Sequence, residues 1–432
     1  MIAIAAAAIF LITYALIATE KVHRVAAALG GVAGMALLGL VNAHSAFFDE
    51  QTGVDWNVVA LLFGMMVVVS VLRHTGLFEF ISLWAARASR GSPRRLMLLL
   101  IAVTAVFSPI LDNVTTVLLV APVSLAVCAR LKFNPTPHLI ALILTSNIGG
   151  LSTLIGDPPN IIVASRSGIT FNDFLVHALP LCVLLLAAMI GLLQILFRRE
   201  LSQRSTVDIA TLRIDPMEAI PDKPLLVRCL VVLVIVIGAF TLHEWIPFEP
   251  SIVALLGAGL MVLVSGTKPE QFLAEVEWMT LAFFMALFVL VGALVQVGII
   301  GNLGALAARA MNGNELLGAT GLLVGSTVIG GLVDNIPYTT AMVPIVQDMV
   351  ASTAHAGAAS PLWWAFVFGA DLAGNATAVA AGANVVVLGI AAKSGQPISF
   401  WDFTRRGLVV TAVTVAIAWL YVWVRYFILG GV

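Results

Sequence analysis

Charged side chains are scarce in this chain, which rules out most soluble folds. Asp, Glu, Lys and Arg make up 10% of its 432 residues, whereas hydrophobic residues make up 60%. A soluble domain carries about 25% charged residues, so a chain with a mean hydropathy of +1.05 has a bilayer as its solvent. Each helical span needs about 20 apolar residues, and this length therefore allows about ten spans. The longest polar stretch, residues 198–223, indicates a linker and not a separate soluble domain.

Cysteine is also rare, and the three that occur are too scattered for a disulfide framework or a metal site. Small apolar packing is the ordinary role of residues such as Cys128, Cys182 and Cys229. The sequence also lacks a cluster of metal ligands, a nucleophile beside a base and a cofactor loop. We therefore expect no enzyme activity, no catalytic residue, no cofactor and no bound metal. The net charge of −1 gives no indication of a nucleic-acid partner.

What the chain does contain is an internal repeat. Asp112-Asn113 and Asp334-Asn335 stand 222 positions apart, and so do Trp56 and Trp278. Recurrence at one fixed offset predicts two copies of the same structural unit. We expect each copy to contain five transmembrane helices and one re-entrant hairpin that does not cross the bilayer. The predicted copies are residues 1–200 and 223–432, joined by a cytoplasmic linker at 201–222.

An odd number of crossings per copy places the second copy upside down relative to the first, and the charge distribution agrees. With the N-terminus outside, 19 of the 22 Lys and Arg residues fall in inside loops, as the positive-inside rule requires. No basic residue precedes the first apolar run, residues 1–18, so we expect a first span and not a cleaved signal peptide. The expectation is an all-α polytopic protein of the inner (plasma) membrane with two inverted-topology repeats.

Polar residues interrupt the apolar segments twice in each copy. The predicted hairpins, residues 95–131 on the cytoplasmic side and 316–352 on the outer side, turn at the two Asp-Asn pairs. Helices 138–167 and 361–393 are each broken in the middle by glycines and polar residues. In lipid, backbone at a helix break survives only where it is buried in protein or lines a cavity. Inverted repeats with broken helices are a transporter architecture, with solute and coupling ions bound near the midplane.

Local sequence signals predict where the first broken helix ends and where it resumes. Gly149-Gly150 ends one helix, and Asp157-Pro158 predicts the start of the next, with Asp as N-cap and Pro at the first helical position. The restarted helix points its N–H groups and a partial positive charge at the break. The second break has the same skeleton but different charges, because Asp371 aligns with Asn147 and Ala381 aligns with Asp157.

Acidic residues at membrane depth are costly and mark functional sites by default. Capping of a hairpin explains Asp112 and Asp334 only in part, since a surface turn would serve that purpose; for Asp157, capping alone remains an alternative. A carboxyl that takes a proton in one conformation and releases it in another couples transport to proton flow. We expect that role at Asp112, Asp334 and Asp371.

The tips and breaks together supply the expected ligands for solute and ions. No Lys or Arg lies at either predicted site, which favours a neutral polyol-like solute or a small cation over a tightly bound anion. The predicted binding residues are Asp112, Asn113, Thr115, Thr116, Asn147, Ser152, Thr153, Asp157, Asn160, Asp334, Asn335, Thr339, Asp371, Asn375, Thr377 and Asn384.

At these motifs the sequence resembles the ArsB/NhaD branch of the ion transporter superfamily, which includes arsenite efflux permeases, sodium/proton antiporters and the melanosomal P protein. The resemblance covers nearly the whole chain and is most specific at residues 111–116, 147–150, 156–160 and 333–337. It implies a scaffold domain and a transport domain of two hairpins and two broken helices, which moves in an elevator-like way. Dicarboxylate carriers of the superfamily carry paired Ser-Asn-Thr motifs, and here Ile148 follows Ser146-Asn147, which disfavours a dicarboxylate.

The resemblance and the site composition together predict secondary active transport, with export of arsenite and antimonite by proton antiport. Arsenite at neutral pH is mostly uncharged As(OH)3, which suits amides, hydroxyls and acids, and the cysteines do not lie at the motifs. Two alternatives stay open: sodium/proton antiport through the same acids, and anion (chloride) transport at the hairpin N-termini. The expected partners are the solute, protons and the bilayer, with either a cytoplasmic arsenical-pump ATPase or a second copy in a homodimer.

Overall fold

The computed structural model describes residues 2–19, 22–202, 215–242, 245 and 248–430. All regular elements in this part of the chain are helical and no strand occurs there, which confirms the predicted all-α class. Most of the predicted linker, residues 203–214, lies outside the described residues, as does Lys21 from the charge count.

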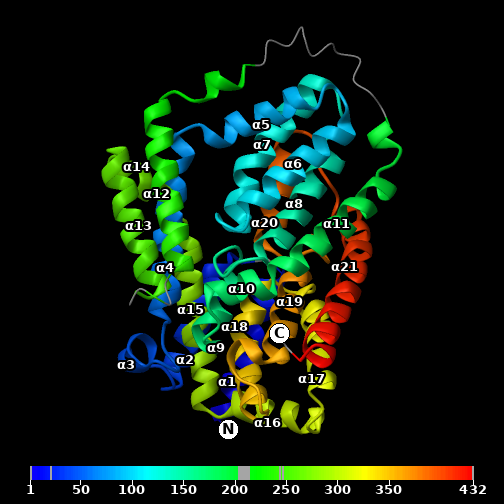
Figure 1. Ribbon diagram of the computed structural model, residues 1–432. Helices are drawn as coiled ribbons and strands as arrows, with labels where there is room; N and C mark the ends of the chain where they lie inside the picture. The colour runs from blue at the N-terminus through cyan, green and yellow to red at the C-terminus, as the bar shows by residue number, and fades with distance from the viewer. Residues whose placement is uncertain (1, 20–21, 203–214, 243–244, 246–247, 431–432) are drawn as a thin grey trace.

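The helices of the first half run from α1 to α11 (Figure 1). Their bounds are α1 Ile2–Thr19, α2 Arg24–Leu37, α3 Ala43–Phe47, α4 Trp56–His74, α5 Leu77–Ala88, α6 Pro93–Phe107, α7 Asn113–Leu131, α8 Thr136–Gly150, α9 Pro158–Ser167, α10 Phe171–His177 and α11 Leu179–Leu196. The second half runs from α12 to α21: α12 Lys223–Thr241, α13 Pro250–Ser265, α14 Pro269–Glu275, α15 Trp278–Gln296, α16 Ile299–Met311, α17 Glu315–Gly330, α18 Asn335–Ala351, α19 Pro361–Ala373, α20 Gly382–Lys393 and α21 Phe400–Val422. Short 3-10 turns occur at Glu200–Ser202, Pro216–Ala219 and Gly357–Ala359, and a π-helical turn, Trp423–Ile428, follows α21.

Seven helices in the described part of the chain are long and apolar enough to cross a bilayer. They are α1, α4, α7, α11, α12, α15 and α21 with its π-helical extension. Five shorter helices are also apolar: α2, α13, α16, α17 and α20. The protein is therefore a multi-pass membrane protein, as its composition predicts.

Helix starts follow from local sequence. Proline stands in the first turn of α6, α8, α9, α13, α14 and α19, where its missing N–H would have no intrahelical partner. Side-chain caps begin the helices that follow the two Asp-Asn turns: Asp112 accepts a hydrogen bond from the Thr115 amide, and Asp334 accepts one from the Ile336 amide. Both Asp-Asn pairs therefore stand at the start of a helix.

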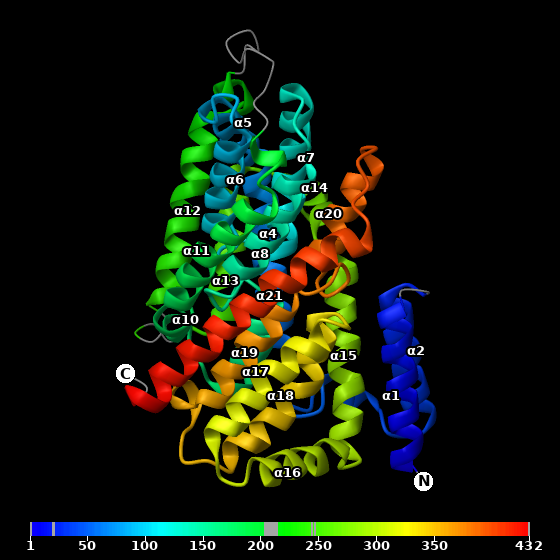
Figure 2. The same ribbon diagram turned by 90° about the vertical axis from the view of Figure 1, so that its right-hand side faces the viewer.

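The helices pack in two groups (Figures 1 and 2). The first group, called the outer group from here on, contains α1, α2, α4, α12, α13 and α15. In it α4 packs on α13 and α12, and α15 packs on α2 and α1. In the second group α6 and α7 pack on α8, while α17 and α18 pack on α19. Glycine allows the closest approach in the outer group, because a Cβ at Gly64 would lie 2.7 Å from the backbone of Ala254. Direct contacts between the two groups include those of α9 with α4 and of α18 with α15.

The hairpin-forming helices lie at opposite ends of the molecule. Both views place α6 and α7 towards one end, and α17 and α18 towards the other (Figures 1 and 2). Each pair turns towards the centre, where α8 ends at Gly150 and α19 ends at Ala373. The helices resume only at Pro158 and Gly382, so two stretches of non-helical backbone meet in the middle of the protein.

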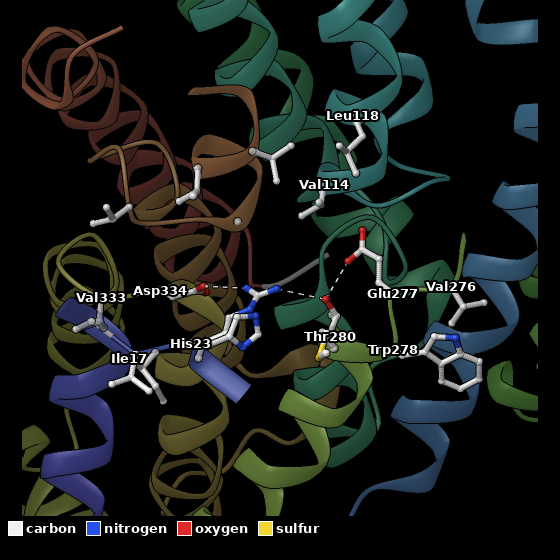
Figure 3. A pocket seen from close by; sticks show the side chains of 18 of the residues that line it. Ile17, His23, Val114, Leu118, Val276, Glu277, Trp278, Thr280, Val333 and Asp334 are labelled. Atoms are coloured by element: carbon white, nitrogen blue, oxygen red, sulfur yellow. Dashed lines mark hydrogen bonds and ion pairs between the residues drawn. The ribbon is translucent and has the colours of Figure 1, made fainter. Parts of the chain in front are cut away.

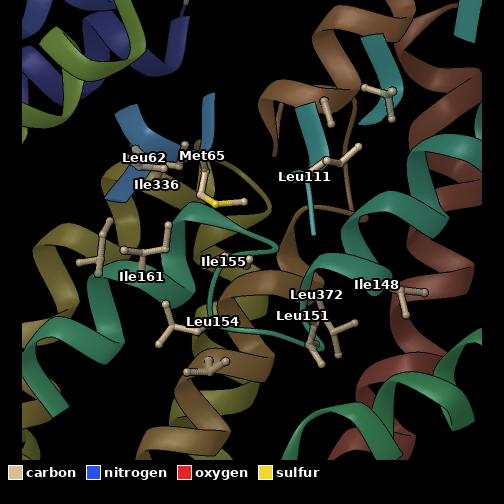
Figure 4. Packing of buried hydrophobic residues seen from close by; sticks show 14 of the residues in the cluster. Leu62, Met65, Leu111, Ile148, Leu151, Leu154, Ile155, Ile161, Ile336 and Leu372 are labelled. Carbon is tan, nitrogen blue, oxygen red and sulfur yellow. The ribbon is translucent and has the colours of Figure 1, made fainter. Parts of the chain in front are cut away.

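Apolar side chains enclose these central stretches. Figure 4 shows the shell around the first break, where Leu151, Leu154 and Ile155 pack with residues of neighbouring helices. All three side chains are buried. The shell excludes solvent from the breaks, so their backbone groups depend on protein partners.

Gly150 is required by a close approach inside the first break. A Cβ at this position would lie 2.6 Å from the Gly156 carbonyl oxygen, which is backbone and cannot turn away. We expect Gly150→Ala to lower the free energy of unfolding by about 1 to 3 kcal/mol, the usual cost of forcing an extra methyl into a packed site.

Gly191→Ala is the matched control, because a Cβ at Gly191 in α11 would meet no atom within 4 Å. The midpoint of thermal unfolding in detergent should fall for Gly150→Ala and stay constant or rise for Gly191→Ala. Equal midpoints for the two variants would contradict the close contact between Gly150 and Gly156.

Candidate functional site

Two asparagines hold the central breaks in the same way. The Asn160 side-chain nitrogen donates to the carbonyl oxygens of Gly150 and Thr153, at 3.2 and 3.0 Å. In the other half, the Asn384 nitrogen donates to Gly374 and Thr377, at 2.6 and 2.8 Å. Each amide stands in the first turn of the restarted helix and closes the loop between the helix halves. Asn160 and Asn384 therefore make matching hydrogen bonds in the two breaks.

A chain of amides links the two breaks. Asn384 uses both hydrogens on carbonyl oxygens, so its oxygen accepts from Asn147 Nδ2 at 3.2 Å. The Asn147 nitrogen also donates to Asn375 Oδ1 at 3.0 Å, and its oxygen accepts from Asn113 Nδ2 at 3.3 Å. Backbone carbonyls fix the direction of the Asn384 amide. The positions of oxygen and nitrogen in the other side-chain amides of the network then follow from their hydrogen bonds.

Two carboxyls lie in this cluster. Asp157 and Asp371 are both 1% exposed. Asp157 Oδ2 accepts from Asn113 Nδ2 at 3.0 Å, and Asp371 lies next to the Asn160 side chain. Asp157 occupies the N-cap position of α9, as predicted, but its side chain makes no capping hydrogen bond, because the carboxyl turns to Asn113 instead.

Several buried polar atoms of the cluster have no hydrogen-bond partner among the described residues. A buried polar group without a partner costs about 1 to 3 kcal/mol, so such a concentration indicates a position for a ligand. The acceptors are Asn113 Oδ1, Asp157 Oδ1, Asn160 Oδ1 and both oxygens of Asp371, and the possible donors are Asn335 Nδ2, Asn375 Nδ2 and the Thr339 hydroxyl.

The remaining predicted residues are engaged in building the tips and the breaks. Asp112 accepts from the Thr115 amide at 2.8 Å and from its hydroxyl at 2.7 Å, while Thr116 donates to the Asp112 carbonyl. Thr153 donates to the Pro109 carbonyl, and Thr377 donates to the Gly331 carbonyl, so each break is tied to the neighbouring hairpin turn. Ser152 donates to the Gly149 carbonyl.

The backbone at the first hairpin turn is strained. Asp112 has φ of +54°, in a region that non-glycine residues rarely occupy. Asp334, its counterpart, has an ordinary φ of −62°. The two tips thus share a residue pair and a capping role but differ in backbone, and strained backbone persists only where the surroundings hold it in place.

Arg24 is a site residue that sequence reasoning missed. The sequence predicts no Lys or Arg at either site, and it places Arg24 among the 19 basic residues of the inside loops. Its Nη1 lies 3.8 Å from Asp334 Oδ2, and its Nη2 donates to the Thr280 hydroxyl at 3.3 Å. Thr280 donates in turn to Glu277 at 2.9 Å (Figure 3). The contact joins segments far apart in sequence, and no spacing or motif signals it.

Two cavities adjoin this charged contact. A pocket of about 750 Å3 is lined by Arg24, Asp334, Glu277 and apolar residues of α1, α7, α15 and α20 (Figure 3). A smaller cavity of about 40 Å3 is lined by Asp112, Arg24, Glu277 and Pro158. Both hairpin turns therefore face the α2–α15 part of the outer group, with one cation and three acids gathered there.

Comparison with known proteins agrees with a transporter. The family model described as "Citrate transporter" matches residues 14–369. An uncharacterized transporter of Mycobacterium tuberculosis is 49% identical over 427 residues, which cover 99% of each chain. The human P protein is 32% identical over 98% of this chain, and the chain spans 60% of its length. The YdaH transporter of Alcanivorax borkumensis, at 13% identity, shares the fold with a TM-score of 0.59 over 86% of this chain and 85% of YdaH.

The contact between Arg24 and Asp334 is measurable as a coupling energy. Their side chains are 35% and 16% exposed, so we expect a coupling of about 0.2 to 1 kcal/mol, as found for other partly solvated ion pairs. The measurement is a double-mutant cycle of Arg24→Gln and Asp334→Asn on the free energy of unfolding. Arg94, an exposed residue of the other hairpin, gives the control cycle with Asp334→Asn, and its effects should be additive. Additivity in the Arg24 cycle as well would contradict the ion pair.

Proposed function

The chain belongs to the citrate transporter family of the ion transporter superfamily, and it is a secondary transporter, not an enzyme. From this premise we propose that it exports arsenite and antimonite from the cytoplasm in exchange for protons. The observation that carries the proposal is the buried cluster of amides and carboxyls between the two breaks. Its unpartnered atoms include five acceptor oxygens, two amide nitrogens and one hydroxyl. No Lys, Arg or His side chain hydrogen bonds to Asp157 or Asp371 within the described residues.

A neutral trihydroxide fits such a site. As(OH)3 donates through its hydroxyl hydrogens to acceptor oxygens and accepts through its oxygens from amide nitrogens. A thiolate site has no support, because Cys182 donates to the Ile148 carbonyl at 3.2 Å and Cys128 and Cys229 are buried elsewhere. The proposal therefore assigns recognition to oxygen and nitrogen atoms and not to sulfur.

Anions are less well served by the same residues. Citrate, named in the family description, would bring several negative charges to a cluster that already holds two carboxyls and no hydrogen-bonded cation. Chloride at the hairpin N-termini, the other anion considered, would meet Asp112 and Asp334, which already cap those helices. Helix N-termini attract anions only where the amides are available to them.

We further propose that the two halves, residues 1–200 and 223–432, are inverted repeats. The matched hydrogen bonds of Asn160 and Asn384 support this, and so does the pair Gly76 and Gly298, which precede α5 and α16 with the same φ of 75° and ψ of 9°. The location of the two hairpins at opposite ends supports it as well (Figure 2). The charge count then places the N-terminus outside and the α6–α7 hairpin on the cytoplasmic side of the inner membrane.

The proposed mechanism is an elevator in which the group that contains both breaks moves against the outer group. Solute and ion sites lie wholly in the moving group. Three acids were predicted to couple transport to protons. We assign this role to Asp371, because neither of its carboxyl oxygens has a hydrogen-bond partner among the described residues. Asp112 and Asp334 cap the hairpin helices and face the outer group, so we assign them to the sliding interface.

Sodium/proton antiport is the second candidate, and a specific observation favours it. Hard cations prefer oxygen ligands, and Asp157, Asp371, Asn113 and Asn160 offer five unpartnered oxygens. Competition between sodium and protons at the acids would then produce exchange. The two functions use one site and differ in whether a hydroxylated solute or a sodium ion enters it.

Everted membrane vesicles with an imposed acid-inside pH gradient distinguish the two candidates. We expect arsenite to accumulate inside the vesicles, accumulation to stop with a protonophore, and sodium chloride to leave the gradient unchanged. A variant with Cys128, Cys182 and Cys229 replaced by Ser should retain uptake. Sodium-dependent dissipation of the gradient without arsenite uptake would refute the arsenite proposal in favour of sodium/proton antiport.

A reversible cross-link tests the elevator. In the cysteine-free background, Arg24→Cys with Asp334→Cys joins the outer group to the α17–α18 hairpin through a short bifunctional thiol reagent. Uptake should be lost on cross-linking and restored by reduction. The control pair, Asn57→Cys with Ser251→Cys, joins α4 to α13 within the outer group, where the native side chains are 3.0 Å apart, and should leave uptake unchanged. Full uptake with the first cross-link in place would rule out movement between the two groups.

A further inference from the structure

Asp157 and Asp371 form a pair of buried acids that neither half of the chain contains alone. Asp157 precedes α9, and Asp371 lies in the last turn of α19. Asn160, in the same first turn of α9 that follows Asp157, lies beside Asp371, so the two acids belong to one cluster. When the two halves are aligned, Asp157 faces Ala381 and Asp371 faces Asn147. The alignment therefore predicts one such pair of acids and not two.

The two amides that contact these carboxyls, Asn160 and Asn113, have no further hydrogen to give them. Asn160, beside Asp371, gives both amide hydrogens to the carbonyls of Gly150 and Thr153. Asn113 gives one contact to Asp157 Oδ2 and the other to Asn147. Three of the four carboxyl oxygens in the pair therefore have no donor among the described residues.

Charge around the pair makes two ionised carboxylates costly. The other charges that act on Asp157 are the acids Asp112 and Asp334, which have the same sign. Arg24 contacts Asp334 and Thr280 at the interface with the outer group and not Asp157 or Asp371. From α11, the thiol of Cys182 faces α8 and donates to Ile148 and not to an acid. Two like charges in a low-dielectric site favour retention of one proton between them.

We propose that Asp157 and Asp371 share one exchangeable proton and that this pair, built across the two halves, is the coupling site of the transporter. The proton supplies the missing donor: bound to one carboxyl, it satisfies one of the three unpartnered oxygens. With the proton bound the pair carries one negative charge, and on release it carries two. The structural part of this assignment is independent of the solute, whereas its role in coupling rests on the proposed function.

Under this proposal the solute and the proton compete for the same atoms. The unpartnered oxygens of Asn113 and Asn160 belong to residues that contact the two carboxyls. A hydroxylated solute that donates to these oxygens and to the ionised pair supplies the donors that the proton otherwise supplies. Entry of the solute therefore releases the proton, and return of the proton releases the solute, which is the requirement for one-for-one exchange.

Infrared spectroscopy of the purified protein tests the pair without any transport assay. Protein labelled with carbon-13 at the aspartate carboxyls should show the carbonyl stretch of a protonated carboxyl at neutral pH. That band should disappear in Asp157→Asn and in Asp371→Asn and persist in Asp112→Asn. The wild-type spectrum alone already tests the idea, since absence of a protonated aspartate band would overturn it even if a variant fails to fold. Loss of the band on replacing choline chloride with sodium chloride would overturn the proton as the resident ion and assign sodium instead.

Transport measurements separate the coupling role from the proposed function. Asp371→Asn and Asp157→Asn should lose at least tenfold in pH-driven accumulation of arsenite, and any remaining exchange of labelled for unlabelled arsenite should no longer depend on pH. Asp55→Asn, an acid at the start of α4 that caps that helix, is the control and should keep both activities. Accumulation that survives in either core variant would overturn the coupling role while leaving arsenite export intact. A protonated pair in a protein that moves no arsenite would overturn the export proposal while leaving the pair intact.

Discussion

The structure depends on how backbone polar groups are satisfied where two helices are interrupted inside an apolar protein. A helix break in a bilayer leaves carbonyl and amide groups without intrahelical partners, and each unsatisfied group is costly. Asn160 and Asn384 meet this requirement with two hydrogen bonds each to carbonyls of their own break. Because both amide hydrogens are consumed, the oxygens of these residues are left as acceptors, and the polarity of the whole central cluster follows from that constraint.

The two helix breaks have similar backbone but different charges. Asp157 and Ala381 both stand before a restarted helix, with φ of −142° and −147°. One position carries a carboxyl and the other a methyl group, while the acid of the second break, Asp371, aligns with the amide of Asn147. Because the two breaks have similar backbone but different charged residues, Asp157 and Asp371 both belong to the central cluster, and the alignment contains no second pair of acids.

Sequence reasoning reached the local features and missed the long-range ones. Helix starts at Asn113, Pro158 and Asn335 were predictable, because acidic caps and proline act within one helical turn. The all-α membrane class followed from composition, and the similarity to the P protein is confirmed at 32% identity. The family match is to citrate transporters, and it does not single out the arsenite branch that the motifs suggested. Arg24 was placed in a loop, because nothing in a single sequence indicates that residues 24 and 334 are in contact.

The ranking of the acids also needed three-dimensional information. From sequence, Asp112 and Asp334 were the most conspicuous acids because they recur, and recurrence is a property of backbone architecture. Their carboxyls cap helices and face the outer group, where Arg24 and Glu277 complete a charged interface. Asp157 and Asp371 do not recur, and their oxygens are the ones left without partners. The acids that recur in the sequence therefore cap the hairpin helices, and the acids that do not recur are the ones to which we assign the proposed proton coupling.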